Sequence, residues 1–496
     1  MACFPMGSQL LFVLSAWFTI LVIQHCFSRT VCRTLSHNVS GYTYTAILLP
    51  NFPCVVHITT DSYCRIDITD TTAHVLAMAN PVRKDSILPQ RKPNYARPYN
   101  TNDLRDYSKF QMHFKKDFSL GEGGDGTVFA YQHKRSKQFI AVKTPVCPTA
   151  SSRLSAEIAN LQTLGSHPHI VSMVAFSTNF KPCGPAIFLD LCDLGDLNNY
   201  MEQLSAQQLK QGSPTSQIPE ATVWKLLRDM SLALDHIHNR HHNRGYLHND
   251  IKPANILVTF PLGWSFEENG IPAEPLFQLT DFSRMMPYPT PSPATRTASR
   301  TCTRFLGTPE YAPPPSEQHW MRPSGDMWSL GATLQTLALG IYPTRSRESL
   351  IAARKARRRS YPLLYDDAAW ADNYWRTTLH TMYRPLSVPH AQLRRDYDFR
   401  DSLGVLAVDE QARSEGKRPY SKVLEAWYQT LWNEVPEERI TAAMLVRYLV
   451  PGIEVKMQVA RHVNEAYACF ERARRVREAL ERRRVVRGRV GEVVGL

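Results

Sequence analysis

The stretch His-Asn-Asp-Ile-Lys-Pro-Ala-Asn, residues 248 to 255, indicates more about this chain than any other part of it. It combines a carboxylate at Asp250, an ammonium at Lys252 and an amide at Asn255. These groups suit phosphoryl transfer, because the carboxylate can orient a hydroxyl and accept its proton, the lysine can neutralise phosphoryl charge, and the amide can hold a magnesium ion. A polar loop can match such a short pattern by chance, so the interpretation depends on further motifs in the right order.

A glycine-rich segment, Leu120 to Val128, lies upstream and fits the spacing Gly-x-Gly-x-x-Gly-x-Val. The same glycine spacing occurs in dinucleotide-binding turns, where a helix follows directly. Residues 127–131 are instead rich in β-branched and aromatic side chains, which is typical of a strand. We therefore expect a hairpin with glycines at its bend, whose backbone N–H groups can approach phosphates without clashes from Cβ atoms.

Lys143 ends the apolar strand that follows, and an ammonium in a nucleotide cleft needs an anionic partner. The candidate is Glu157. It borders an apolar stripe at helical spacing, made of Leu154, Ile158, Leu161 and Leu164. A glutamate on an isolated helix is more often simply solvated, but the order and spacing of the motifs favour a pair between Lys143 and Glu157.

Four further motifs follow in order: Gln278 to Ser283, Gly307 to Pro313, Ser324 to Gly331, and Pro436 to Ile440. Together, the motifs resemble those of the eukaryotic protein kinase superfamily across residues 114–449, and Lys252 resembles the serine/threonine type. The resemblance implies an α+β, two-lobed protein kinase fold. It would have a small β-rich N-lobe with one regulatory helix, about residues 114–190, and a larger, mainly helical C-lobe, about residues 193–449.

The resemblance assigns catalytic and metal roles to individual residues. Asp250 would position the substrate hydroxyl, with Lys252 beside the transferred group, and these two are the expected catalytic residues. Asn255 and Asp281 would hold Mg²⁺. Asp326 would bond the backbone of the catalytic loop.

The nucleotide site implied by the resemblance lies between the lobes. The strand ending near Leu189 would lead into the hinge, where backbone groups of Asp190 and Cys192 meet the adenine. The residues expected to bind ATP are Leu120, Gly121, Gly123, Gly126, Val128, Ala141, Lys143, Glu157, Asp190 and Cys192.

The implied activity is transfer of the γ-phosphate of ATP to protein hydroxyls by a serine/threonine protein kinase, with ATP and Mg²⁺ as cofactors and proteins as substrates. One alternative is a pseudokinase scaffold that binds ATP weakly or not at all, which the changed residues Asn249, Ser283 and Pro314 favour. The retained phosphate, proton and metal groups argue against it. A second alternative, a small-molecule kinase, should lack the peptide-docking segment Gly307 to Pro313.

Asn249 stands where the family usually has an arginine that holds a phosphate on the activation segment. A neutral amide cannot pair with a dianion as a guanidinium does. We therefore expect an activity that does not depend on phosphorylation of that segment, for example at Ser299, Thr301 or Thr303.

Two other departures concern the C-lobe. Pro314 stands where the family has a glutamate that pairs with the late arginine, Arg439, so we expect Arg439 either to pair with Glu310 or Glu317 or to stay solvated. Asn255 and Asp281 are 26 positions apart, about twice the usual interval. The insertion should lengthen a β-hairpin at the back of the active site, with Asn-Gly as its turn.

The composition is compatible with one enzyme domain plus extensions: 496 residues, 43% hydrophobic, with a net charge of +13. Basic clusters occur at 354–359 and 461–489, and such runs can bind nucleic acid or anionic lipid. A solvated face of an amphipathic helix is the simpler interpretation of the tail, residues 452–496. Its apolar positions lie three or four apart: Val459, Val463, Ala466, Phe470, Ala473, Val476 and Leu480. The chain contains no Cys-x-x-Cys pair, so the sequence does not support a zinc site.

The amino-terminal part is harder to interpret. Residues 1–28 contain an apolar run that is shorter than the ~20 residues of a membrane span. We therefore expect either a membrane anchor that extends over residues 10–27 or a mis-assigned start codon. Residues 29–110 form an extension with strand-like pieces, such as the one from Cys54, and a linker from Pro89 to Asn102. The kinase domain itself is expected in the cytoplasm or nucleus.

Overall fold

The computed structural model describes residues 99–181, 184–212, 216–239, 245–288, 305–340, 343, 383–388 and 417–493, and the backbone of three strands between residues 33 and 58. The chain divides into two compact units, Met1–Pro89 and Gln90–Leu496. Within the described residues, no helix is both long and apolar enough to cross a membrane. Residues 10–27, the basic cluster 354–359 and the hydroxyls of Ser299, Thr301 and Thr303 lie outside the described residues.

The amino-terminal unit contains a three-stranded antiparallel sheet of β1(Arg33–Val39), β2(Tyr42–Leu48) and β3(Val55–Ile58), in that order. The third strand is the strand-like piece predicted after Cys54.

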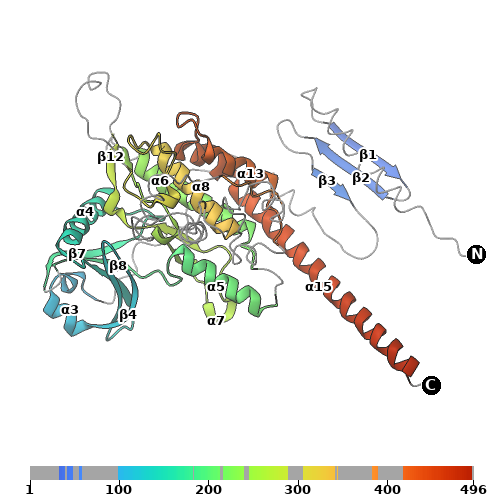
Figure 1. The fold of residues 1–496 in the computed structure, drawn as a ribbon, viewed down its shortest axis with the longest axis horizontal. Helices are drawn as coiled ribbons and strands as arrows, with labels where there is room; N and C mark the ends of the chain where they lie inside the picture. Colours follow the sequence, from blue (N-terminus) through green and yellow to red (C-terminus); the bar gives the residue numbers. More distant parts are fainter. Residues whose placement is uncertain are drawn as a thin grey trace, which may run out of the picture. The chain divides into compact units, whose positions relative to one another are not determined.

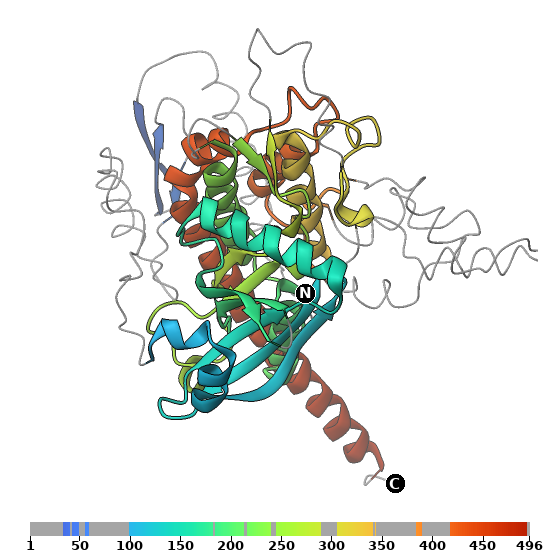
Figure 2. The same cartoon turned by 90° about the vertical axis from the view of Figure 1, so that its left-hand side faces the viewer.

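The N-lobe of the second unit is built on a five-stranded antiparallel sheet in the order β4-β5-β6-β8-β7 (Figure 1). Its strands are β4(Phe114–Gly123), β5(Gly126–His133), β6(Phe139–Thr144), β7(Met173–Phe180) and β8(Gly184–Asp190). The predicted glycine hairpin joins β4 to β5, with Gly123 paired to Gly126. Helix α4(Pro148–Leu164) lies beside this sheet (Figure 2) and buries the predicted stripe of Leu154, Ile158, Leu161 and Leu164.

The other side of the sheet carries a second apolar cluster, which the sequence left unassigned. Two short elements precede the first strand: η1(Thr101–Leu104) and α3(Tyr107–His113). Asp106 caps α3 by accepting hydrogen bonds from the N–H groups of Ser108 and Lys109. Phe110 is buried, with its ring 4.9 Å from that of Phe114. The sheet is therefore covered by chain that precedes residue 114.

The C-lobe is mainly helical. Its longer helices are α5(Leu197–Lys210), α6(Glu220–Asn239), α8(Pro323–Leu339), α13(Lys422–Gln429) and α15(Ile453–Val493). Shorter elements complete it: β9(Gly245–Leu247), η2(Pro253–Asn255), β10(Ile256–Thr259), α7(Phe266–Asn269), β11(Leu276–Leu279), η3(Phe282–Arg284), β12(Met286–Tyr288), η5(Pro309–Tyr311), η7(Thr430–Trp432), α14(Ala442–Met444), the π-helical turn η8(Leu445–Leu449) and η9(Val450–Gly452).

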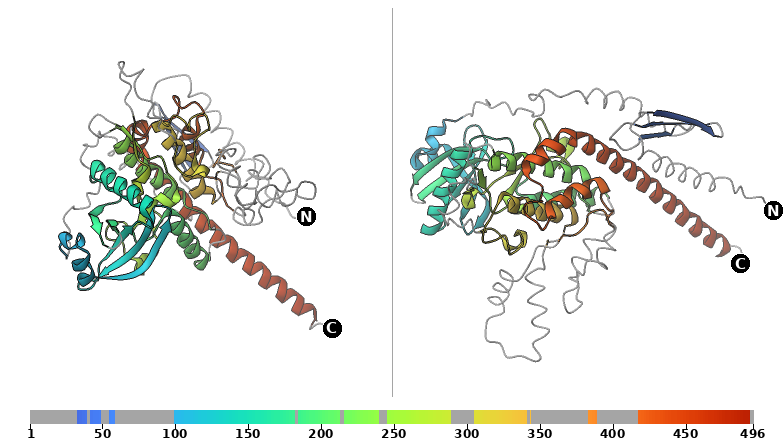
Figure 3. Two further views of the ribbon diagram at one scale, coloured as in Figure 1. Left: turned by 60° about the vertical axis from the view of Figure 1, so that its left-hand side comes forward. Right: turned by 90° about the horizontal axis from the view of Figure 1, so that it is seen from above.

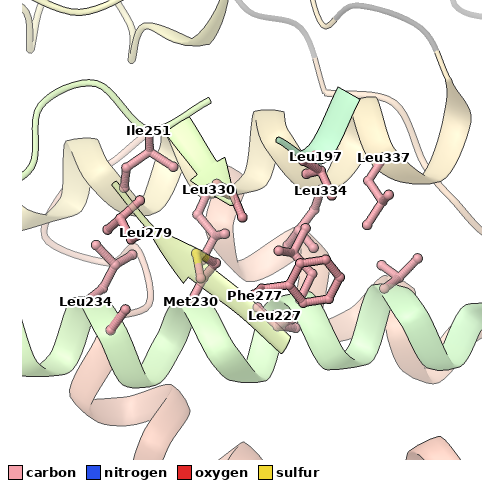
Figure 4. Packing of buried hydrophobic residues seen from close by; sticks show 14 of the residues in the cluster. Leu197, Leu227, Met230, Leu234, Ile251, Phe277, Leu279, Leu330, Leu334 and Leu337 are labelled. Atoms are coloured by element: carbon pink, nitrogen blue, oxygen red, sulfur yellow. The ribbon is translucent and has the colours of Figure 1, made fainter. Parts of the chain in front are cut away.

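The core of this lobe lies where α6, α8 and β11 meet. Figure 4 shows Leu227, Met230 and Leu234 of α6 facing Leu330 and Leu334 of α8. Every residue of α8 from 325 to 339 is buried, including the polar residues Asp326, Ser329, Thr333, Gln335 and Thr336. Burial of each large apolar side chain contributes about 1.5–3 kcal/mol to the stability of this lobe.

The insertion after residue 255 forms the predicted hairpin of β10 and β11 with α7 in its loop. The Asn-Gly pair ends α7, with Gly270 at φ +66°, and is not the two-residue hairpin turn that we expected. Ile271 donates its N–H to Gln207 Oε1 at 2.7 Å, and Tyr200 donates its hydroxyl to the carbonyl of Pro272 at 2.9 Å. The insertion is thus bonded to α5.

The tail is a single 41-residue helix, α15, as predicted, but the apolar face that packs is a different one. Ile453, Met457 and Ala460 are buried, whereas Val463 and Phe470 of the predicted stripe are exposed. The helix continues well beyond the lobe on which its first turns pack (Figure 3). Its arginines make contacts within the chain; Arg461 pairs with Glu274, for example, and Arg474 with Glu471 and Glu478.

Candidate active site

The catalytic loop is held in place by a buried carboxylate of α8. Asp326 accepts hydrogen bonds from the backbone N–H of His248 at 2.8 Å and of Asn249 at 2.9 Å, and its Oδ2 lies 2.9 Å from Nε2 of His238. Burial acts to raise the pKa of Asp326, but the contacts with His238, His248 and Asn249 bring it below its ordinary value. Asn249 itself adopts φ +66°, the left-handed conformation that asparagine tolerates better than most residues. The predicted bond from Asp326 to the loop is confirmed.

Asp250 is oriented by groups from two segments. Its Oδ1 accepts the N–H of Thr308 at 2.9 Å and the hydroxyl of Thr308 at 2.8 Å. Its Oδ2 lies 3.1 Å from Nζ of Lys252 and accepts a bond from Nδ2 of Asn255 at 3.2 Å. Lys252 also donates to the Thr308 hydroxyl at 2.7 Å. The carboxylate is therefore held in one orientation, as needed to orient a hydroxyl and accept its proton.

Thr308 was not among the predicted site residues. Its signal in the sequence was the Gly-Thr-Pro motif, which the sequence analysis treated as a docking segment for peptides. Only the fold shows that this threonine contacts the Asp250 carboxylate, since Asp250 and Thr308 are 58 positions apart.

A second acidic cluster lies at the base of the N-lobe. Nζ of Lys143 lies 2.7 Å from Oε2 of Glu157 and 3.2 Å from Oδ1 of Asp281, so the predicted ion pair is present and a second carboxylate shares it. Burial raises the pKa of Glu157 to about 7, because Lys143 offsets only part of the desolvation. Burial would lower the pKa of Lys143, but the two carboxylates raise it. Burial likewise favours the neutral form of Asp281, yet Lys143 and Ser283 bring its pKa below the ordinary value.

The two clusters are connected through the segment before Asp281. Thr280 donates its N–H to the carbonyl of Asn255 at 3.0 Å, and its own carbonyl lies 3.0 Å from Nε2 of His248. Residues separated widely in the sequence thus converge on one place between the lobes, as expected from the motifs.

The expected ATP-binding residues form a second group along β4, β5, β6 and the end of β8. Gly126 has no room for a side chain, because a Cβ there would lie 2.5 Å from the carbonyl oxygen of Thr144. Ala141 is buried and pairs with Leu189 across the sheet. Cys192 is buried after β8, and its carbonyl accepts the N–H of Gly195 at 3.1 Å. The others, Leu120, Gly121, Gly123, Val128 and Asp190, lie on these strands.

Arg439 pairs with one of the two glutamates that were predicted as its partners. Arg439 is fully buried and contacts both carboxylate oxygens of Glu317, at 2.7 and 2.9 Å. It also donates to the carbonyl of Ser324 at 2.8 Å and lies over the ring of Trp328. Glu317 therefore replaces the glutamate that Pro314 displaces, and this pair stabilises the C-lobe rather than the site.

The residues suit magnesium and a nucleotide. Nδ2 of Asn255 is engaged by the carbonyl of Asp250 at 2.8 Å, which leaves the amide oxygen as an acceptor. Together with the Asp281 carboxylate, it forms an all-oxygen donor set, the kind that Mg²⁺ prefers when phosphates supply further ligands. Within the described residues, no larger cluster of His, Cys, Asp and Glu offers an alternative metal site.

A two-lobed α+β fold with a lysine–glutamate pair above a buried catalytic loop defines a protein kinase type of site. The family model of the protein kinase domain matches residues 114–449, so the chain belongs to the protein kinase family.

Curated relatives share this domain at low identity. A serine/threonine-protein kinase ATG1 of Beauveria bassiana is 26% identical over 274 residues, which is 48% of this chain and 27% of the relative. One of Colletotrichum lindemuthianum is 25% identical over 48% of this chain and 37% of its own length. The mitosis inhibitor protein kinase wee1 of Schizosaccharomyces pombe is 28% identical over 46% of this chain and 23% of its own length. The matches thus span between just under a quarter and just over a third of the length of these relatives.

Proposed function

We propose that this chain is an ATP- and Mg²⁺-dependent protein kinase that phosphorylates serine or threonine hydroxyls of protein substrates. The observation that carries the proposal is the state of Asp250, whose two oxygens are oriented by Thr308, Lys252 and Asn255 while the Lys143–Glu157 pair is formed. A scaffold without catalysis would have no need for both arrangements. The names of the curated relatives, serine/threonine kinases among them, support the same substrate class.

The mechanism assigns a role to each group of the chain. Lys143, positioned by Glu157, would bind the α- and β-phosphates of ATP, and Asn255 with Asp281 would hold Mg²⁺, which neutralises phosphate charge when bound. Asp250 orients the substrate hydroxyl and accepts its proton as the oxygen attacks. Lys252, 3.1 Å from Asp250, places a positive charge beside the transferred group.

The test is phosphotransfer by the purified full chain, with labelled ATP, magnesium and a generic basic protein. We expect Asp250→Asn and Asp281→Ala to lower the rate by about a thousandfold or more, since each removes a group that acts on the reacting atoms. The matched control is Asp117→Asn, an exposed position on β4. A wild-type chain no more active than Asp281→Ala would favour the pseudokinase alternative, and that outcome would overturn the proposal.

We also propose that activity does not require phosphorylation of the activation segment. Support comes from Asn249, whose N–H is bound to Asp326 and whose side chain carries no charge to hold a phosphate. Treatment of the active protein with a phosphatase should leave its rate unchanged. A tenfold drop that rephosphorylation restores would show that another basic group holds such a phosphate.

A further inference from the structure

The tip of the glycine-rich hairpin is unusual in its composition. Residues 123–126 read Gly-Gly-Asp-Gly, so Asp125 carries the only side chain at the bend. A Cβ at Gly123 or Gly124 would meet nothing within 4 Å, so no other part of the chain packs against the side-chain side of the backbone at these two positions. Glycines lose more conformational freedom than other residues when they are ordered. A fixed position of this loop therefore needs an anchor.

Asp125 supplies contacts to two other segments. Its Oδ1 accepts a hydrogen bond from Nη1 of Arg153 on α4 at 2.6 Å. Its Oδ2 accepts the hydroxyl of Ser283 at 3.0 Å and lies 3.9 Å from Nη2 of Arg284. The Asp125 side chain is only 14% exposed although it lies at a loop tip. One carboxylate thus joins the hairpin to α4 and to the beginning of the activation segment.

Ser283 gives this contact its specificity. It occupies the position after Asp281-Phe282 where the kinase pattern has glycine, and glycine has no hydroxyl to donate. The two unusual residues, Asp125 and Ser283, are 158 positions apart and meet directly. The arginines matter for a second reason: a carboxylate near nucleotide phosphates would repel them, and Arg153 and Arg284 oppose that charge.

We propose that Asp125 is a latch that holds the glycine-rich loop closed against α4 and Ser283 and thereby slows the release of nucleotide. The nucleotide part of this inference rests on the proposed function, whereas closure of the loop does not. Arg284 extends the connection, because its Nη1 donates to the carbonyl of Leu306 at 3.0 Å, close to the peptide-docking segment. Loop closure is in this way tied to the segment that contains Thr308.

The experiment compares three variants of the full chain: Asp125→Asn, Ser283→Gly and the double variant. Ser283→Gly restores the residue of the kinase pattern and removes the hydroxymethyl group, and with it the donor to Asp125. The matched control is Glu122→Gln, an exposed carboxylate of the same hairpin. Two measurements are made on each protein: amide hydrogen exchange of residues 119–128 without nucleotide, and the dissociation rate of a fluorescent methylanthraniloyl-ADP.

We expect Asp125→Asn to speed both exchange and dissociation about five- to tenfold and Ser283→Gly about two- to fivefold, as for loss of charge-assisted hydrogen bonds. The double variant should resemble Asp125→Asn, because residues in one contact are not additive. Wild-type exchange in Asp125→Asn would overturn the latch, and slower dissociation would show that Asp125 obstructs the nucleotide instead.

The two proposals fail in distinguishable ways. Faster exchange in the variants without any binding of the fluorescent ADP would leave the closed loop established, remove its effect on nucleotide release and contradict the proposed function. Normal ADP binding with identical exchange and dissociation in all variants would contradict the latch and leave the kinase assignment intact.

Discussion

Glu157 in the N-lobe and Asp326 in the C-lobe are both fully buried carboxylates beside the active site, yet their surroundings are opposite. Among the described residues, the cation that pairs with Glu157 is Lys143, which Glu157 shares with Asp281. Asp326 accepts two backbone N–H groups and lies within hydrogen-bond distance of His238. The pKa of Glu157 is raised to about 7, whereas that of Asp326 is lowered. Burial alone therefore does not decide the charge state; the number of directed donors does.

Because of this difference in surroundings, the Lys143–Glu157 pair can be broken at small cost, whereas the hydrogen bonds of Asp326 cannot. Loss of the Lys143–Glu157 pair leaves Lys143 bound to Asp281, and protonation of Glu157 satisfies the remaining carboxyl. Loss of Asp326 leaves backbone N–H groups of His248 and Asn249 without an acceptor inside the protein. Helix α4 is thus attached through a reversible ion pair, and the catalytic loop through a permanent set of hydrogen bonds.

The largest expected effect follows from Asp326→Asn. Oδ2 accepts from His248 and Oδ1 from Asn249, so whichever end the amide NH₂ takes, it faces a donor. We expect the free energy of unfolding to fall by about 3 kcal/mol, as when a buried network loses one partner. Urea unfolding followed by tryptophan fluorescence measures this.

The control for that measurement is Glu434→Gln, an exposed carboxylate of the same lobe, which should unfold like the wild type. If Asp326→Asn also unfolds like the wild type, the catalytic loop does not depend on this carboxylate and the comparison with Glu157 is wrong.

Much of this site was predictable from the sequence because its residues occur in motifs with fixed spacing. Asp250, Lys252 and Asn255 lie within one loop, and the order and spacing of the motifs predicted the contact of Glu157 with Lys143. Local periodicity was sufficient for α4, since a helix with one buried stripe has one way to face a sheet.

Contacts between distant segments that no motif describes were not predictable in this way. Thr308 on Asp250 and Ser283 on Asp125 depend on the fold, and neither pair has a local pattern. The helix α15 shows a second limit. It has two apolar faces, and periodicity cannot tell which one packs; the shorter one, with Ile453 and Met457, is buried. Helix α3 covers the N-lobe sheet through Phe110, but this helix is too short for its sequence to show a helical hydrophobic period.

A pH dependence of stability sharpens the comparison. The pKa of Glu157 in the folded chain, about 7, lies above its ordinary value of 4.5, so the folded state binds the proton more tightly than the unfolded state. The stabilisation is present below pH ~4.5 and is lost as the pH rises through about 7. Relative to Glu157→Gln, which cannot titrate, the wild type should lose about 2.5 kcal/mol between these limits.

Urea unfolding of both proteins at intervals from pH 4.5 to 8 tests this, since the difference between them cancels the other titrating groups. The pKa of Asp326 is lowered, so its contribution has the opposite sign: it is present above pH ~4 and lost only on acidification. A wild type that gains stability over Glu157→Gln as the pH rises would show that Lys143 outweighs desolvation at Glu157.

The smallest expected effect is that of Glu157→Gln on catalysis. Glutamine can still accept a hydrogen bond from Lys143, but without charge it competes poorly with Asp281, which lies 3.2 Å from the same ammonium. We expect kcat/KM for ATP at pH 8 to fall about tenfold, or about 1.4 kcal/mol of transition-state stabilisation, because Lys143 and α4 are held less well. Lys143→Met should lose at least another tenfold, since it removes the phosphate ligand itself. Glu202→Gln, an exposed glutamate on α5, serves as the control.

The loss of kcat/KM in Glu157→Gln should shrink as the pH falls below about 7, because the wild-type Glu157 then becomes neutral as well. A constant tenfold loss from pH 6 to pH 8 would mean that Glu157 stays ionised throughout, and its pair with Lys143 would then be as permanent as the bonds of Asp326.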